Sequence, residues 1–253
     1  MNTADLSKAK LLSEQIAAAC GTPRFYREQK APVDESVRLF TNSPMVAACV
    51  EILTSRADVS GHGLSHSRTV AIDAGAIILI ERGSSAQSKR LVMLAHLAGV
   101  LHDIRRAGKD HARRGADEAE EILTGFEVTD TERRAVVDAI RNHEAFQPCV
   151  PLGDPDAQLL SDALYDADKF RWGPDNFTEM LWDIAATRNV SVASLLPYFP
   201  SGFESLREIR KTFRSVTGKR YGPDFIDRGL RIGEALRAEL TGMYLPDTSA
   251  EPD

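Results

Sequence analysis

The chain has 253 residues, of which 43% are hydrophobic and 27% are charged, and its formal net charge at pH 7 is −6. This composition is typical of a globular protein with enough apolar residues for a large core. The negative charge argues against a protein that coats nucleic acid or an anionic membrane, but it allows a local basic pocket for a small phosphorylated substrate.

The cysteines and the apolar runs indicate a cytoplasmic location. Cys20, Cys49 and Cys149 are odd in number and lack the spacing of metal ligands, so we expect free thiols. The first residues lack the layout of a signal peptide. The longest apolar run, 74–80, is too short to cross a bilayer. We therefore expect a cytoplasmic protein without membrane contact.

The N-terminal part predicts two helices that carry no chemistry. The first covers 4–20 and ends at Gly21, because glycine commonly follows a helix C-terminus. The second covers 44–57, with Ser43 as its N-cap and Pro44 in the first helical position. Between the two helices we expect a polar connection that contains proline.

The next five predicted helices each carry histidine or aspartate on or beside an apolar face. Their apolar residues recur every three or four positions, as on one face of a helix. The first of these helices opens with residues 61–66 and runs to about residue 81, and the second covers 88–103. The third begins at 111, the fourth has Asp130 as its N-cap, and the fifth covers 156–169. The polar residues that face inward are His66, His102, Asp103, His111, His143 and Asp168.

These inward residues predict a metal site. Burying a carboxylate costs several kcal/mol unless it is paired or binds a cation. An isolated His102–Asp103 pair is explained by a hydrogen bond at a helix end, but helix bundles build metal sites from several such helices. Imidazole with carboxylate suits Fe, Mn, Zn, Ni or Co, and the lack of thiolate argues against structural zinc. A buried polar network without metal is the alternative.

Two nearby residues are expected to lie outside the ligand set. His96 falls off the apolar stripe of the helix that carries His102, so we place it at the surface or behind the ligands. Asp166 is about 200° around its helix from Asp168, so the two are not expected to bind one ion. Residues 145–155 predict a loop, and further helices are expected at 175–188, 202–217 and 223–243. We find no strand alternation, so the predicted fold class is all-α.

The order His66, His102-Asp103 and Asp168 resembles the HD-domain superfamily of metal-dependent phosphohydrolases. The resemblance covers about residues 60–170 and rests on the local sequences HSRTV, LAGVLHDI, HARRGA, RNHE and DADKF. It implies an HD-domain helical bundle with N-terminal and C-terminal helical additions. The implied segments are an extension packed on the core (1–58), the metal-binding core (59–172), helices that complete the same domain (173–245) and a disordered tail (246–253).

The resemblance also implies a ligand set. His66, His102, Asp103 and Asp168 would bind a first metal. In members with two metals the aspartate corresponding to Asp103 bridges, and His111 and His143 match the remaining ligands in type and context. The implied cofactor is one or two divalent or transition metal ions among Fe, Mn, Zn, Ni, Co and Mg.

The implied reaction is hydrolysis of a phosphate ester or anhydride, in a nucleotide or related small metabolite, by metal-activated water. We expect Asp103, Lys169 and Arg106 to serve catalysis, and His62, Arg106 and Lys169 to bind substrate. The other basic runs are expected to be solvated helix faces. We also expect a homodimer.

Two other functions are alternatives, of which the first uses the same ligands and the second is found in proteins that usually lose some of them. Some proteins of this superfamily are di-iron oxygenases, and others are non-catalytic signalling or binding modules. The cyclic-dinucleotide subclass is disfavoured because Tyr221-Gly222-Pro223 has the wrong order for its Gly-Tyr-Pro signature. The alarmone hydrolases carry an acidic pair that is missing here. The dinucleoside polyphosphate hydrolases share the HD and H-x-x-x-G-A layout.

Overall fold

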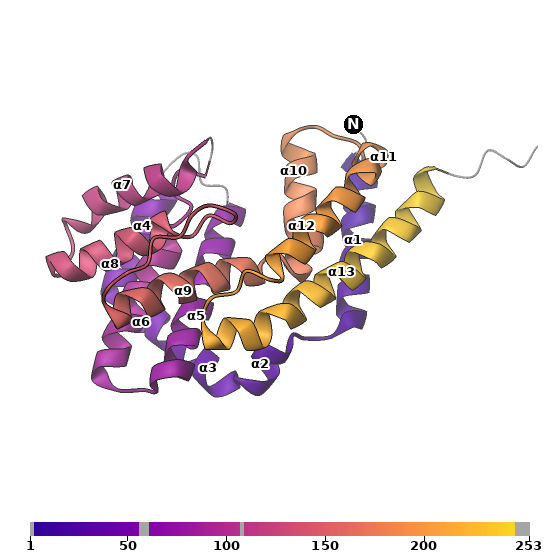
Figure 1. Cartoon of the computed structure of the whole chain (residues 1–253). Helices are drawn as coiled ribbons and strands as arrows, with labels where there is room; N and C mark the ends of the chain where they lie inside the picture. The colour runs from indigo at the N-terminus through magenta and orange to yellow at the C-terminus, as the bar shows by residue number, and fades with distance from the viewer. Residues whose placement is uncertain (1–2, 56–60, 107–108, 246–253) are drawn as a thin grey trace, which may run out of the picture. The chain divides into compact units, whose positions relative to one another are not determined.

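The computed structural model describes residues 3–55, 61–106 and 109–245, with residues 3–4 and 61–62 described by their backbone only. Throughout these ranges the regular elements are helices and there is no strand (Figure 1). The predicted all-α class is therefore confirmed. Within the same ranges, no helix has the length and apolarity needed to cross a membrane.

Contacts divide the chain into two compact units, which are described separately. The larger unit comprises Phe25–Lys169 and Thr212–Gly222, and the smaller unit comprises Met1–Arg24, Phe170–Lys211 and Pro223–Asp253. Each unit combines segments that are distant in the sequence, whereas the predicted segments are continuous. The predicted boundaries after residues 58 and 172 therefore stay a prediction. The predicted tail, 246–253, lies outside the described residues.

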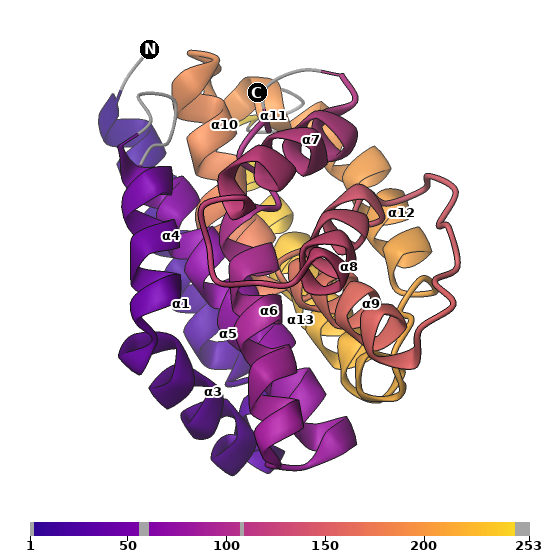
Figure 2. The same cartoon turned by 90° about the vertical axis from the view of Figure 1, so that its left-hand side faces the viewer.

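The larger unit is built around α6. Its helices are α2 (Arg24–Glu28), α3 (Lys30–Asn42), α4 (Pro44–Thr54), α5 (Gly61–Arg82), α6 (Ala86–Leu101), α7 (His111–Leu123), α8 (Asp130–Arg141) and α9 (Pro155–Phe170). Helix α6 packs against α3, α4, α5 and α8, and α7 packs against α8 (Figure 2). A helix with neighbours on so many sides needs apolar residues all around it.

The sequence of α6 meets that need, and this corrects the prediction of a single buried face. From Leu91 to Leu101 every residue except Met93 is buried. His96 is fully buried as well, with its Nε2 3.0 Å from Ser36 Oγ on α3. A surface position for His96 is therefore wrong.

Small residues let α5, α6 and α7 approach closely near the predicted ligands. A Cβ added at Gly99 of α6 would lie 2.4 Å from Ala71 Cα of α5, which is too close for any side chain. A Cβ added at Gly115 of α7 would lie 3.2 Å from the carbonyl oxygen of His102. Gly99 precedes His102 by three residues, and Gly115 follows His111 by four. The same contacts that seal the core therefore bring three ligand-bearing segments together.

Several predicted helix ends need correction. The expected connection before Ser43 contains α3, which tolerates Pro32 because proline is compatible with the first helical turn. Ser43 caps α4 as predicted, by accepting a hydrogen bond from the Val46 N–H. Helix α8 is capped by Thr129 and not by Asp130. The Thr129 hydroxyl accepts from the Glu132 N–H, and the Glu132 carboxylate accepts from the Thr129 N–H.

The smaller unit holds the remaining helices. They are α1 (Thr3–Cys20), the π-helix η1 (Asn176–Met180), α10 (Leu181–Thr187), α11 (Val192–Leu195), the 3₁₀ helix η2 (Leu196–Tyr198), α12 (Phe199–Ile209) and α13 (Val216–Tyr244) from Pro223 onward. The rings of Phe177, Phe199 and Phe203 meet in its core. The helix predicted at 202–217 ends at Ile209. The last helix was predicted to begin at Pro223, but it begins at Val216 and contains Pro223 in its interior.

Candidate metal site

The six residues predicted as metal ligands all come together inside the larger unit. They arrive from α5, the end of α6, the start of α7, the end of α8 and the last turns of α9. Five of them form two groups that could hold a cation, namely His66, His102 and Asp103, and Asp103, His111 and His143, so Asp103 belongs to both groups. The sequence pattern therefore found a spatial cluster drawn from segments that lie up to 102 residues apart.

The first group surrounds His66 and His102. The two Nε2 atoms are 3.3 Å apart. Asp168 Oδ1 lies 3.3 Å from His66 Nε2 and 3.7 Å from His102 Nε2. Asp103 Oδ2 lies 3.8 Å from His66 Nε2 and 3.5 Å from His102 Nε2. Each of the two carboxylates thus lies 3.3–3.8 Å from both imidazole nitrogens.

The second group extends from the other oxygen of Asp103. Oδ1 of that residue lies 3.6 Å from His143 Nε2, and the rings of His143 and His111 are 5.2 Å apart between centroids. Asp103 therefore directs Oδ2 toward the first group and Oδ1 toward the second. A carboxylate in this arrangement can bridge two cations.

Backbone carbonyls fix the orientation of two imidazoles. His102 Nδ1 donates to the Gly99 carbonyl at 2.8 Å, and His143 Nδ1 donates to the Ile140 carbonyl at 2.6 Å. Because each Nδ1 faces an acceptor, it carries the hydrogen, and Nε2 is left to present a lone pair to the cluster. Histidines that bind metals are commonly held in this way by a bond from the other ring nitrogen.

The cluster keeps its carboxyl groups ionised. Burial alone would raise the pKa of Asp103, but His102, the neighbouring His143 and the charge of Arg106 hold it well below its usual range. Burial is likewise offset at Asp168, where Lys169 and the imidazoles of His102 and His66 lower the pKa. Two carboxylates that stay charged in a buried site attract a cation strongly.

The histidines respond to the same charges. Burial disfavours the imidazolium of His102, yet Asp103 and Asp168 more than offset that effect and raise its pKa. At His111, burial and the neighbouring His143 lower the pKa instead. Metal binding requires the neutral imidazole, so a cation entering the first group must displace a proton favoured by the two carboxylates.

The two basic residues singled out from the sequence lie against these carboxylates. Lys169 is 3% exposed, and its Nζ lies 2.5 Å from Asp168 Oδ2 and 3.1 Å from the His143 carbonyl. Arg106 Nη1 lies 3.1 Å from Asp103 Oδ2, and its side chain is 53% exposed. Lys169 thus ties α9 to the end of α8, whereas Arg106 is accessible from solvent.

The residues present fit one or two bound metal ions. Zinc and similar ions bind imidazole and carboxylate at about 2.0–2.2 Å, so two ligands of a tetrahedral site lie about 3.4 Å apart. The distances of 3.3–3.8 Å within the first group approach this value. The donor set of imidazole and carboxylate without thiolate matches catalytic sites better than structural zinc sites.

Some residues around the cluster were not among the predicted site residues. Glu144 Oε2 lies 3.8 Å from His111 Nδ1, and its position next to His143 in the RNHE motif was a usable signal. Arg214 lies with its guanidinium 3.5 Å from the centre of the Tyr165 ring, and it donates to the Asn142 carbonyl. The basic run that contains Arg214 was expected to be a solvated helix face, but Arg214 lies outside the helices and is partly buried.

The predicted substrate ligand His62 needs a partial correction. The position of His62 between Gly61 and Gly63 favours a place outside the regular helix, but α5 begins at Gly61, so the backbone of His62 is helical. The side chain of His62 lies outside the described part of the structure. Its contact with substrate stays a prediction.

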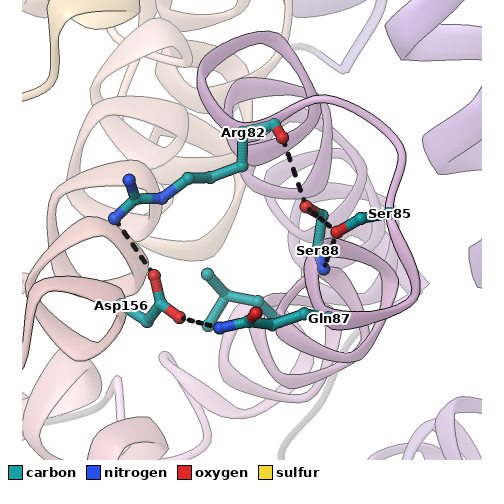
Figure 3. Close-up of a pocket in the computed structure, with 6 residues that line it drawn as sticks. Arg82, Ser85, Gln87, Ser88 and Asp156 are labelled. Carbon is teal, nitrogen blue, oxygen red and sulfur yellow. Dashed lines mark hydrogen bonds and ion pairs between the residues drawn. The ribbon is translucent and has the colours of Figure 1, made fainter.

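A pocket of about 250 Å³ lies elsewhere in the larger unit, where the end of α5 meets the first turns of α6 and α9 (Figure 3). Asp156 on its rim pairs with Arg82 at 3.0 Å and accepts from Gln87 at 3.0 Å. Ser88 bonds with Ser85, which caps α6. Each polar residue drawn in Figure 3 has a partner among the others. The pocket lies at a junction between helix ends, and none of the predicted ligands lines it.

Comparisons with family models, with curated proteins and with solved structures find no match to this chain.

Proposed function

We propose that the chain is a metal-dependent phosphohydrolase of the HD-domain superfamily, acting in the cytoplasm on a phosphate ester or anhydride of a nucleotide or related small metabolite. The proposal rests on one observation above all. Asp103 presents its two oxygens to two separate groups of imidazoles. This arrangement suits a pair of metal ions, and such pairs serve in-line displacement at phosphorus.

Each residue of the cluster has a distinct task in this proposal. His66, His102, Asp103 and Asp168 would hold one ion, and Asp103, His111 and His143 a second. When bound, the metal lowers the pKa of its water toward neutrality and polarises a phosphoryl oxygen. The chain supplies the ionised carboxylates that bind the cations and the backbone carbonyls that orient the imidazoles.

Arg106 would bind the phosphate. Its half-exposed guanidinium already lies beside Asp103, and arginine binds phosphate through two parallel hydrogen bonds. Lys169 would contribute a positive charge from the buried side of the cluster. Its ammonium pairs with Asp168 and donates to the His143 carbonyl. It therefore keeps Asp168 ionised and adds positive potential for a phosphate dianion.

The proposal is tested by metal analysis together with turnover. Protein purified without chelator should contain Mn, Fe, Co, Ni or Zn at one or two ions per chain, and it should release phosphate from a panel of nucleotides and simple phosphate esters. Asp103→Ala should lose both properties. Asp34→Ala serves as a matched control, because Asp34 is an exposed carboxylate that pairs with Lys30 on its own helix.

Two results would favour the alternatives. Two irons with the absorption of an oxo-bridged pair, and no release of phosphate, would favour the oxygenase. Wild-type protein that neither binds added metal nor turns over any ester would favour a binding module.

A further inference from the structure

Three non-glycine residues have positive φ in the described part of the chain. Two of them lie next to or near the histidines of the second group. Asp110 has φ 56° and immediately precedes His111, while Phe146 has φ 64° and follows His143 by three residues. The left-handed region is unfavourable for residues with a Cβ, and it is an outlier for a bulky aromatic residue. Strain of this kind persists only where the surrounding structure imposes it, and it gathers at functional sites.

The loop that carries Phe146 is held at both ends. Asn142, the C-cap of α8, is 4% exposed, and its side chain donates to the Val150 carbonyl at 2.9 Å and accepts from the Val150 N–H at 3.1 Å. One amide side chain thus closes the loop 143–149 upon itself. Phe146 stands in the middle of that loop, so its backbone is fixed even though its side chain is free of the core.

The side chain of Phe146 does not serve the core of the fold. It is 61% exposed, so its ring gains little from burial. The left-handed backbone adds strain that glycine or asparagine would avoid. A phenyl ring that is both exposed and strained, on a loop held in one shape, is best explained by a ligand that stacks on it.

The loop starts at the metal site, which limits where such a ligand would lie. Phe146 follows His143 by three positions, so their Cα atoms are at most about 11 Å apart. Glu144, two residues before Phe146, reaches His111 of the second group. A molecule with a phosphate at the cluster and a planar ring beyond it would bring that ring toward Phe146.

We propose that Phe146 is a specificity-determining residue that stacks on a planar aromatic ring of the substrate, so that the preferred substrates are phosphate esters or anhydrides that carry an aryl or heteroaryl ring. This inference rests on the proposed phosphohydrolase function. Stacking of an aromatic side chain on a base contributes enough affinity that its loss weakens binding roughly 5- to 150-fold.

The test compares two probes that differ in the ring and cannot be hydrolysed. Calorimetric titration of manganese-loaded protein with phenylphosphonate and with methylphosphonate should show tighter binding of the phenyl compound. Phe146→Gly should lose that preference, Phe146→Trp should keep it, and neither should alter methylphosphonate affinity. Val150→Ala is the matched control, because Val150 is an exposed apolar residue (59%) of the adjoining segment.

Thermal unfolding separates stacking from a structural role. Phe146→Gly should raise Tm by about 2 to 4 °C, because glycine adopts positive φ without strain. A fall in Tm of similar size would show that the ring packs in the fold and would overturn the inference.

The remaining outcomes are also decisive. If methylphosphonate binds but the phenyl compound has no advantage, the inference is wrong and the proposed function survives. If neither phosphonate binds, both fail together. If Phe146→Gly leaves the phenyl preference intact but dissociates a dimer in light scattering, the ring belongs to an interface between copies and the inference is overturned.

Discussion

Replacing Asp168 by asparagine should weaken metal binding and destabilise the fold, and a second substitution separates the two effects. Asp168 Oδ1 faces His66 and His102, and Oδ2 pairs with the buried ammonium of Lys169. The neutral amide would deprive both sides of the negative charge. Loss of a residue that only supports a ligand weakens metal binding 10- to 100-fold, so loss of a ligand should weaken it at least about 100-fold, or about 2.7 kcal/mol.

The same substitution should also destabilise the fold. Removing one partner of a buried ion pair costs about 3–5 kcal/mol, and we expect the lower end because the amide oxygen can still accept from Lys169. A second change isolates this effect. Asp168→Asn combined with Lys169→Met should recover much of the lost stability, since no buried charge is then unpaired, but it should not recover metal binding.

Asp166 provides the matched comparison on the same helix. Its two oxygens accept the backbone N–H groups of Arg214 and Ser215 at 2.8 Å each, just before α13 begins. An asparagine can accept only one of them, so Asp166→Asn should cost about 1–3 kcal/mol. Its metal affinity should stay within about threefold of wild type.

The assay titrates manganese or zinc into each chelator-treated variant by calorimetry, with urea unfolding measured in parallel. A larger loss of affinity for Asp166→Asn than for Asp168→Asn would refute this reasoning. So would an unchanged affinity for both variants.

Three further predictions concern the second group of ligands, the buried His96 and the cap of α8. His111→Ala and His143→Ala should each lower metal content toward one ion per chain by mass spectrometry; a wild type with one ion that both variants retain would show a mononuclear site. Burial lowers the pKa of His96 to about 3. Below pH 6.5 His96 therefore binds a proton in the unfolded chain but stays neutral in the folded chain. Urea unfolding should therefore show stability falling by up to about 1.4 kcal/mol per pH unit from 6.5 toward 3, and a His96→Gln slope equal to wild type would contradict this. Thr129→Ala should lower the free energy of unfolding by about 1 kcal/mol, because it removes the cap of α8. An unchanged urea midpoint would show that the cap does not stabilise the fold.

The helices that carry chemistry were predictable because their apolar stripes are regular. Helix α7 begins at His111 as predicted, and His66 lies one turn before the buried Val70 of α5, in agreement with its predicted inward position. Residues on such stripes point into the core in any all-α fold, so their convergence could be inferred without knowing how the helices pack.

Packing and capping were harder to predict. Helix α6 is buried on nearly every side, so its stripe could not place His96. The cap of α8 depends on Thr129 and Glu132 acting together, and the neighbouring Asp130 offers a competing signal. Asp166 was expected to face away from the ligands, but its bonds to the two residues just before α13 join segments nearly 50 residues apart. No local pattern encodes such contacts.

The most direct test of the central claim is the metal content of the chain with and without Asp103. Wild-type protein and Asp103→Ala, both prepared without chelator and dialysed against trace Mn, Fe and Zn, should be compared by plasma mass spectrometry, with circular dichroism to show that the helices persist. We predict one or two ions per chain in the wild type and none in the folded variant. A folded Asp103→Ala that keeps the wild-type metal content would contradict the proposal that Asp103 joins two metal-binding groups.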